Sequence, residues 1–318
     1  MYAKIKLLLF IKRTFFVNII FARGAGGRYF MRACGFVYSP RRGGNSELAV
    51  REILNCLPDD WEKVMVDLGK LDINPCRACY HCVPEGSKCA IEDELDIIIR
   101  NVKHSDKIII AFPAYIFSAP GPVKNIMDRL LSVTSDYPGW PHPYPDCVVV
   151  NPYGMAEWEG MIKESGIAFA NKLHLNVLAV QPILATLPAD SVRGDNLDVL
   201  HKLASLLEKG KKNPDRSSEF LECPCCTSTA IKINPDGTVK CAVCGATGTL
   251  KRGGKGYEIV QNETDNAGYF TERALANHTN YLTDKKRLFM NTKDIIKEIQ
   301  QKYAEPDYWF KESPDEEK

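Results

Sequence analysis

The apolar positions of this chain fall into short runs that alternate with stretches of helical periodicity. Residues 34–37 and 108–112 are almost continuously apolar, which is typical of strands covered on both faces. In residues 50–57 the apolar positions recur at i, i+3, i+4 and i+7, which predicts a helix. Further strands are predicted at residues 62–68, 147–150 and 176–180, and further helices at 92–102, near 123–130, up to about 173 and at 197–207.

Strands that alternate with helices predict an α/β fold with a doubly wound, five-stranded parallel sheet. In such sheets ligands bind beyond the carboxyl ends of the strands, near the point where the strand order reverses. The loops at residues 39–46, 113–118 and 152–155 each follow a predicted strand. We therefore expect these three loops to meet at one edge of the sheet.

The loop at residues 39–46 has the features of an anion site. A strand, a glycine loop and a helix in this order bring backbone N–H groups and a helix N-terminus to one point, most naturally for a phosphate. Neither the Walker lysine nor a G-x-G-x-x-G pattern is present, so a monophosphate such as that of FMN suits the loop best. The alternative is a polar surface turn capped by Asn45. Candidate donors are Ser39, Arg41, Asn45 and Ser46.

A first group of cysteines comes after the second predicted strand. Cys76, Cys79 and Cys82 follow at intervals of three, and Cys89 closes the group. This tight spacing is typical of the thiolates that hold a [4Fe–4S] cluster. The alternative is that the four thiols are reduced and hold no cluster.

A second group of cysteines has the spacing of a zinc ribbon. Cys223 and Cys226 form one C-x-x-C pair, and Cys241 and Cys244 form another. Between the pairs the sequence predicts strand, turn and strand. Two such pairs joined by a hairpin indicate a closed, structural Zn²⁺ site without redox chemistry, with Cys225 left spare.

Composition narrows the class of protein. The 318 residues are 45% hydrophobic and 25% charged, as in ordinary globular proteins. The net charge of +1 gives no reason to expect a nucleic-acid partner. Nine of the twelve cysteines, namely the eight of the two groups and the spare Cys225, lie in these two stretches, so we expect a reducing, cytoplasmic environment rather than secretion.

The first thirty residues do not fit the fold pattern. Two apolar pieces are split by Lys12 and Arg13, and neither reaches the roughly 20 residues that a membrane span needs. We expect a non-core extension and no integral membrane span. A peripheral membrane anchor is the alternative.

Four motifs occur in the order of a known family. They are the loop at 39–46, the cysteine run at 75–89, Phe-Pro-Ala-Tyr at 112–115 and Val-Lys-Asn-Ile-Met-Asp-Arg at 123–129. Together they resemble the NADPH-dependent FMN reductase family, and more narrowly its iron–sulfur flavoprotein branch, over residues 31–207. Tyr38 departs from the pattern, because relatives usually have a small residue there.

The resemblance implies a flavodoxin-like fold, bound FMN and electron transfer through the flavin. It also implies that Ser39, Arg41, Asn45 and Ser46 hold the phosphate and ribityl end. The flavin ring would be approached by Pro113, Ala114, Tyr115, Ile116 and Phe117.

The predicted function is an FMN-dependent oxidoreductase. It would transfer electrons between NAD(P)H, or a reduced ferredoxin-like protein, and an acceptor, through FMN and a [4Fe–4S] cluster. The flavin carries the chemistry, so no catalytic side chain is predicted. Alternatives are a non-catalytic flavin electron carrier, a cluster-free NAD(P)H-dependent FMN reductase and, with least support, a binding module built on the ribbon. A homo-oligomer is also expected.

The predicted organisation has four parts. They are a non-core extension at 1–30, a flavodoxin-like FMN-binding domain at 31–210, a zinc ribbon at 219–255 and a helical tail at 256–318.

Overall fold

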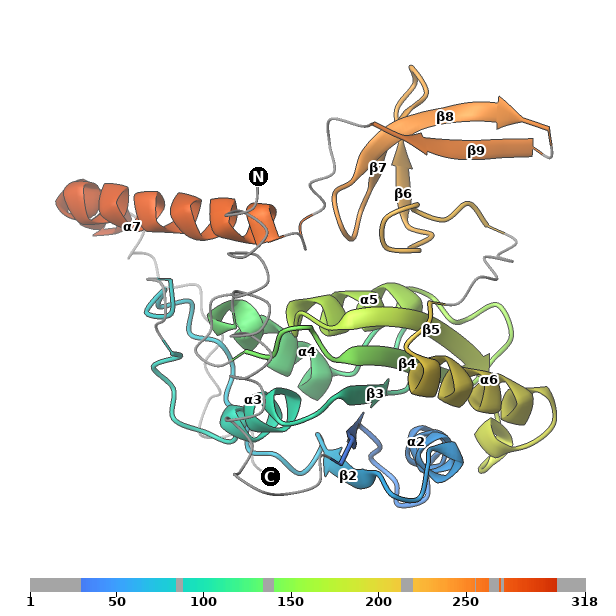
Figure 1. Cartoon of the computed structure of the whole chain (residues 1–318). Coiled ribbons are helices and arrows are strands. Elements are labelled where there is room, and N and C mark those ends of the chain that lie inside the picture. Colours follow the sequence, from blue (N-terminus) through green and yellow to red (C-terminus); the bar gives the residue numbers. More distant parts are fainter. Residues whose placement is uncertain are drawn as a thin grey trace, which may run out of the picture.

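The computed structural model describes residues 30–83, 88–133, 140–212, 220–254, 256–262, 269 and 272–301. The predictions for residues 1–29 and for the acidic end of the chain lie outside these residues. Figure 1 shows a parallel sheet with its helices, a second sheet and one long helix.

The first sheet has five parallel strands in the order β2-β1-β3-β4-β5. This is the flavodoxin-like strand order, with the reversal between β1 and β3. The predicted fold class is confirmed. The strands are β1 Arg32–Val37, β2 Glu62–Asp67, β3 Lys107–Ala111, β4 Asp146–Tyr153 and β5 Asn176–Leu184.

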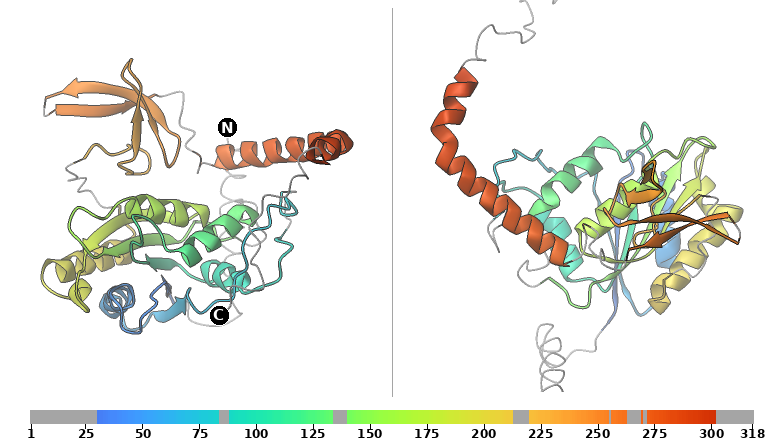
Figure 2. Two further views of the ribbon diagram at one scale, coloured as in Figure 1. Left: turned by 180° about the vertical axis from the view of Figure 1, so that it is seen from behind. Right: turned by 90° about the horizontal axis from the view of Figure 1, so that it is seen from above.

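Helices cover both faces of this sheet (Figure 2). The central strand β3 shows why its sequence is continuously apolar. Ile108 and Ile110 belong to the core beneath α3, α4 and α5, whereas Ile109 and Ala111 belong to the core beneath α2 and α6. The helices are α2 Asn45–Cys56, α3 Leu95–Lys103, α4 Gly121–Arg129, α5 Ile162–Lys172 and α6 Asp195–Lys209, with 3-10 turns η1 Leu130–Ser132 and η2 Asp190–Val192.

The second sheet is antiparallel, in the order β6-β7-β8-β9. Its strands are β6 Ile231–Ile233, β7 Thr238–Cys241, β8 Thr247–Gly253 and β9 Gly256–Gln261. The strand–turn–strand predicted between the cysteine pairs is present as β6 and β7. β9 lies in the stretch that was predicted to be helical, so the helical part starts later, at α7 Glu272–Gln301. Among the described residues, no helix is both long and apolar enough to cross a bilayer.

Hydrogen bonds join the second sheet to α5. Glu164 is only 5% exposed, and its Oε1 accepts hydrogen bonds from Ser228 Oγ at 3.1 Å and from the Thr229 N and Oγ1 atoms at 3.0 Å each. An ion pair between Lys163 and Glu222 lies beside them. A buried carboxylate with three donors is satisfied only while this contact holds, so the contact fixes the ribbon against α5.

Candidate functional site

The loop between β1 and α2 turns around one carbonyl group. The oxygen of Arg41 accepts hydrogen bonds from Ser39 Oγ at 2.7 Å and from Gly44 N at 3.1 Å. A Cβ atom at Gly44 would lie 2.3 Å from Ser39 Oγ and 3.0 Å from Arg41 O, so a side chain there would force the turn or the Ser39 hydroxyl to shift. Gly44 is also the N-cap of α2, and no side-chain cap is found for this helix in the described chain. The first-turn N–H groups of α2 are therefore available to an anion.

One carboxylate already uses this loop as an anion site. Glu47 Oε2 accepts a hydrogen bond from Gly43 N at 2.8 Å, and Glu47 Oε1 accepts one from Arg51 Nε at 2.9 Å. The Gly43 bond, followed by the contact with Arg51, holds the pKa of Glu47 below its ordinary value. The loop therefore stabilises negative charge, as a phosphate site must.

Asn45 connects this loop to the segment that follows β5. Its Nδ2 donates to Ala185 O at 3.1 Å and to Leu187 O at 3.0 Å, and its Oδ1 accepts from Ser191 N at 3.4 Å. Sequence reasoning proposed Asn45 as a direct phosphate donor. In this structure both of its polar atoms have protein partners, so we expect it to act by positioning the loop. Ser46, one residue further on, is buried.

The loop after β3 has a strained turn. Tyr115 N donates to Ser118 O at 2.9 Å, and Ser118 N donates to Tyr115 O at 3.2 Å. Between them Ile116 and Phe117 have φ values of 43° and 63°, a left-handed conformation that is unfavourable above all for a β-branched residue. Ile116 is 90% exposed, and the centres of the Phe117 and Trp158 rings lie 5.3 Å apart. The turn presents apolar side chains to solvent at the edge where cofactors bind in this fold.

Backbone hydrogen bonds bring the predicted loops together at this edge of the sheet. Ala114 N donates to Pro152 O at 2.9 Å, which joins the loop after β3 to β4. Ala185 N donates to Tyr153 O at 2.8 Å, and Asn45 continues the connection to the loop after β1. The loops at 39–46, 113–118 and 152–155 thus share one edge, as expected from the strand order.

The first cysteine group lies in a segment that α4 holds at both ends. Arg129 is 2% exposed, and its Nη1 donates to Asn74 O and to Asp93 Oδ2, both at 2.6 Å. One turn earlier on the same side of α4, Asn125 Nδ2 donates to Ile73 O at 2.6 Å. Burial raises the pKa of Asp93, but hydrogen bonds from Arg129 and from backbone N–H groups outweigh it and leave that pKa below its ordinary value. The sequence motif at 123–129 contributes to the family resemblance but does not by itself predict a role for Asn125 or Arg129.

The four sulfur atoms of this segment do not form a site for a single ion. Cys76 and Cys79 are exposed, and Cys82 and Cys89 are partly buried. Cys76, Cys79, Cys82 and Cys89 are not among the described side chains whose ligand atoms converge within 4.8 Å. Iron–sulfur clusters are larger than one ion and hold their thiolates further apart. One feature suits such a ligand: Ala78 N donates a hydrogen bond to Cys76 Sγ at 3.4 Å.

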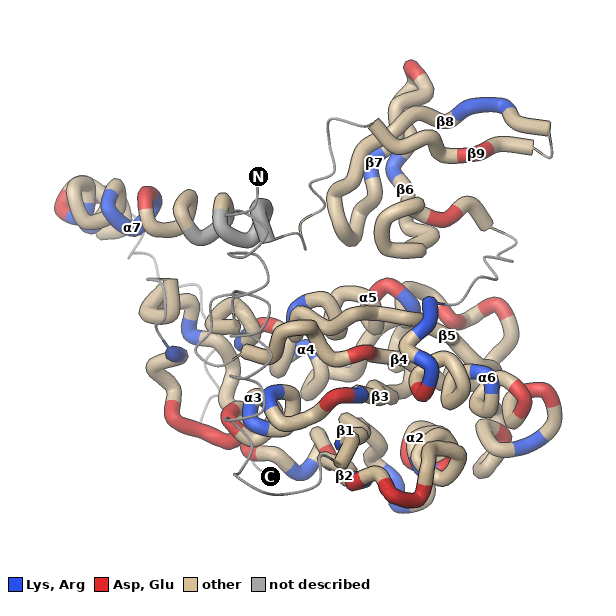
Figure 3. The backbone as a smooth tube through the Cα atoms, in the orientation of Figure 1, with Lys and Arg blue, Asp and Glu red and all other residues tan. Residues whose placement is uncertain are grey.

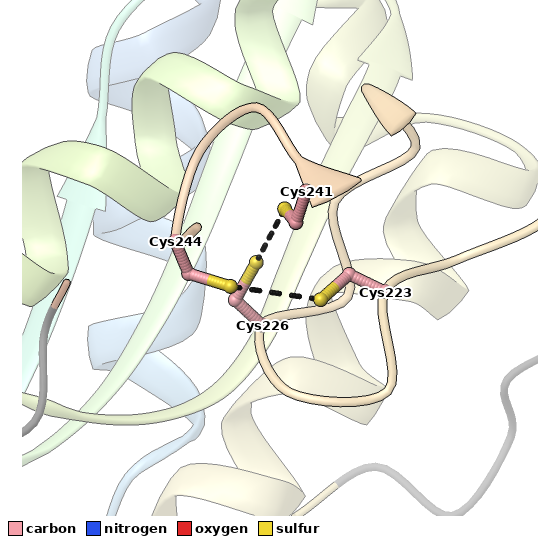
Figure 4. Close-up of side chains that lie close together, drawn as sticks. All are labelled: Cys223, Cys226, Cys241 and Cys244. Atoms are coloured by element: carbon pink, nitrogen blue, oxygen red, sulfur yellow. Dashed lines mark hydrogen bonds between the residues drawn. The ribbon is translucent and has the colours of Figure 1, made fainter. Parts of the chain in front are cut away.

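The second cysteine group is assembled (Figure 4). The Cys223 and Cys244 sulfurs lie 3.6 Å apart, as do those of Cys226 and Cys241, and all four lie within 4.8 Å of one another. Tetrahedral zinc with Zn–S bonds of about 2.3 Å separates its sulfurs by about 3.8 Å, so these positions suit one zinc ion. Cys225, predicted to be spare, is exposed and lies outside the group.

The backbone conformation of the two C-x-x-C pairs, here called knuckles, explains this geometry. Thr227 N donates to Cys223 O at 2.9 Å, and Gly245 N donates to Cys241 O at 3.1 Å, so each C-x-x-C pair is closed by one turn. Thr227 and Gly245 both have left-handed φ values, 64° and 75°. Hydrogen bonding by the neighbouring thiols, first that of Cys226, lowers the pKa of Cys223 to about 7. The same contacts raise the pKa of Cys226 and of Cys244, so the group holds protons that a bound metal would displace.

Fold and site together define the class: a flavodoxin-like α/β protein with a loop suited to a phosphate. More narrowly, residues 31–142 match the family described as NADPH-dependent FMN reductase. This match contains the loop at 39–46, the first cysteine group, the strained turn and the anchoring residues of α4. Over this segment the family predicted from the motifs is confirmed.

Proteins similar to about a third of this chain are iron–sulfur flavoproteins of archaea. That of Methanocaldococcus jannaschii is 38% identical over 100 residues, which are 31% of this chain and 51% of that protein. That of Archaeoglobus fulgidus is 32% identical over 105 residues, 32% of this chain and 46% of that protein. That of Methanosarcina thermophila is 31% identical over 100 residues, 31% of this chain and 52% of that protein. The chain thus spans about half the length of these relatives.

A solved structure of a flavone reductase has a similar fold over more of the chain. The TM-score is 0.65, with 16% identity, and the superposition covers 89% of this chain and 100% of that chain. This coverage reaches beyond the parallel sheet. At such low identity the likeness concerns the fold alone.

Proposed function

We propose that this protein is an FMN-dependent oxidoreductase that passes electrons between NAD(P)H, or a reduced protein, and an acceptor. The observation that carries the proposal is the meeting of a glycine loop at an uncapped helix end with a strained apolar turn at one sheet edge. This edge lies in the segment that matches the FMN reductase family.

Each loop has its own part in holding FMN. The phosphate is placed at the N-terminus of α2, with Ser39, Arg41 and Ser46 beside it and Asn45 positioning the loop. The ring is placed against residues 113–117, where Phe117 and Trp158 would shield one side from water. When bound, FMN supplies both hydride acceptance and single-electron transfer, so the protein's own task is to bind, orient and shield it.

We further propose a [4Fe–4S] cluster held by Cys76, Cys79, Cys82 and Cys89, and Zn²⁺ held by the second cysteine group. A cluster suits a flavin protein because it accepts electrons one at a time. The archaeal relatives, which are called iron–sulfur flavoproteins, support the first proposal. The sulfur distances support the second.

The test of flavin binding changes Gly44, where other atoms already fill the space that a side chain would occupy. Gly44→Ala places a methyl group against Ser39 Oγ and should weaken FMN binding at least about tenfold, because the loop must open to relieve the clash. Gly254→Ala is the matched control, since a Cβ atom there meets no atom within 4 Å. Affinity is measured by quenching of FMN fluorescence. Wild-type protein that does not bind FMN contradicts the proposed function, and equal affinity in the Gly44 variant contradicts the placement of the phosphate.

A non-catalytic electron carrier remains the second candidate, because the strained turn and the exposed Cys76 and Cys79 lie where a protein partner could reach them. Steady-state oxidation of NADH and NADPH with added FMN or quinone separates the two functions. An oxidoreductase turns over with one of the nicotinamides, whereas a carrier is reduced only by a protein donor.

A further inference from the structure

The long helix α7 presents an apolar side that nothing in the described chain covers. Tyr281 and Ile295 are 57% and 60% exposed, and Leu288, Phe289 and Ile299 are also exposed. Figures 1 and 2 show α7 extending away from both sheets. A surface helix is stabilised mainly by the packing of its apolar side, so a helix of this composition needs a partner.

The apolar residues of α7 follow a seven-residue repeat. Tyr281, Leu288 and Ile295 form one row, and the residues immediately after them, Leu282, Phe289 and Ile296, form a second row. A third row, Lys285, Thr292 and Ile299, lies between these two when residues are placed at 3.6 per turn. A seven-residue repeat keeps the stripe straight along a supercoiled pair of helices, whereas packing on a globular core follows the 3.6 period. The pattern favours another helix as the partner.

Basic and acidic residues both occur along α7 (Figure 3), and their spacing places opposite charges at the two edges of this stripe. On the helical projection Lys286 and Lys293 lie along one edge, and Asp284 and Glu298 lie along the other. Arg287 lies behind the acidic edge and contacts Asp284 at 3.1 Å. When two copies of this helix lie parallel, the basic edge of one meets the acidic edge of the other. When they lie antiparallel, like charges meet on both sides.

We propose that α7 is the site of self-association, and that its stripe is covered by the α7 of a second copy of this chain in parallel orientation. The stripe from Tyr281 to Ile299 is about 28 Å long at 1.5 Å per residue. Lys285 belongs to the third row, in the middle of the stripe, and its ammonium lies 5.1 Å from the centre of the Tyr281 ring. A lysine within such a seam fixes the register of the two helices and lowers the stability of the pair. The association should therefore be specific and reversible.

The test of the surface compares two variants of the full chain by sedimentation equilibrium. Leu288→Glu with Ile295→Glu places charges in the seam and should weaken self-association more than about tenfold, because unpaired buried carboxylates are costly. Met290→Glu is the matched control, since Met290 is exposed on the far side of the helix and its change should have no effect. Circular dichroism confirms that each variant is folded. A double variant that associates like the wild type overturns the proposal.

Orientation is tested by exchanging charges. Lys286→Glu with Lys293→Glu should weaken a parallel pair about tenfold or more, and adding Asp284→Lys with Glu298→Lys should restore it. In an antiparallel pair the two basic edges face each other, and after the first exchange two acidic edges do so instead, which leaves the repulsion in place. An unchanged affinity after that exchange therefore overturns the parallel arrangement.

A lipid surface is the other occupant that an amphipathic helix with lysines can bind. Co-sedimentation with vesicles of phosphatidylcholine and phosphatidylglycerol separates the two. Vesicle binding that the Leu288 and Ile295 changes abolish, in a chain that sediments as a monomer throughout, assigns the stripe to lipid and overturns self-association.

Discussion

Both cysteine groups offer four thiols, but only one of them brings its sulfur atoms together. In the ribbon, Cys223 and Cys244 lie 3.6 Å apart, and so do the other two cysteines. In the segment that contains Cys76 and Cys89, the sulfurs do not converge within 4.8 Å. Both groups contain C-x-x-C pairs, so this pairing alone does not decide whether a site is preformed.

The difference follows from what holds each group. Each C-x-x-C pair of the ribbon is closed by its own backbone turn, and three of the four cysteines of the group are buried. Asn125 and Arg129 of α4 hold the other segment where it begins and ends. A single ion fits the first arrangement. The second arrangement suits the larger cluster proposed above, whose binding would itself bring the thiolates together.

The largest expected effect comes from breaking the preformed site. Cys241→Ser removes one buried zinc ligand, and structural zinc sites contribute on the order of 10 kcal/mol to the folding of their small domains. We expect loss of zinc and of hydrogen-exchange protection in β6 to β9, with the parallel sheet unaffected. Cys225→Ser, outside the site, should keep its zinc. Full protection of the ribbon without metal would show that the sheet folds without it.

The next effect comes from breaking the anchor of the first segment. Arg129→Met leaves the Asp93 carboxylate buried without its partner, which should cost about 3–5 kcal/mol in the free energy of unfolding. Iron content should fall with it, because the ends of the segment are released. Lys124→Met is the control: it breaks an exposed ion pair with Asp128 on the same helix and should cost less than about 1 kcal/mol. Urea unfolding of both variants measures the difference. Equal costs would mean that the buried pair does not anchor the segment.

The ion pair between Arg129 and Asp93 also predicts a smaller, pH-dependent effect on stability. The pKa of Asp93 is lowered in the folded state, so its contribution to stability is complete above the unfolded pKa of about 4. That contribution is lost as the pH falls through the lower pKa of the folded state. Asp93→Asn should therefore flatten the decline in unfolding free energy between pH 5 and pH 3. An unchanged slope in this variant would assign the decline to other carboxylates.

The smallest expected change in stability comes from the exposed cysteine of the first group. Cys79→Ser should leave the unfolding free energy of the metal-free protein within about 0.5 kcal/mol of the wild type, because the side chain is on the surface. The proposed cluster should nevertheless be lost, while zinc and flavin stay bound. Visible absorbance and elemental analysis report both. Iron retained at the wild-type level would exclude Cys79 as a ligand.

Local pattern was enough to predict most of the fold. The apolar run that became β3 and the pattern of α2 needed only the hydrophobic periodicity of neighbouring residues. The strand β9 was missed because Gly256–Gln261 pairs with β8 and is strongly exposed, so burial left little pattern in its sequence. Of the helical tail predicted at 256–318, the described helix is α7, Glu272–Gln301, whose heptad rows give it a clear apolar periodicity.

For the site, sequence predicted which loops meet but not what each side chain contacts. The role of Arg129 depends on Asp93, which is 36 positions away, and that of Asn45 depends on carbonyl groups about 140 positions away. Such contacts are set by the packing of α4 and by the end of β5, and no local signal contains them. The cysteine spacing was informative because knuckle turns are local.

The most direct test of the contrast between the two cysteine groups is the metal content of the full chain prepared without oxygen. Inductively coupled plasma mass spectrometry should find about four irons and about one zinc per chain, if the first group holds a cubane cluster and the ribbon a single ion. Zinc without iron in protein that carries its full flavin would contradict the proposed cluster, and two zinc ions per chain would contradict the distinction between the sites.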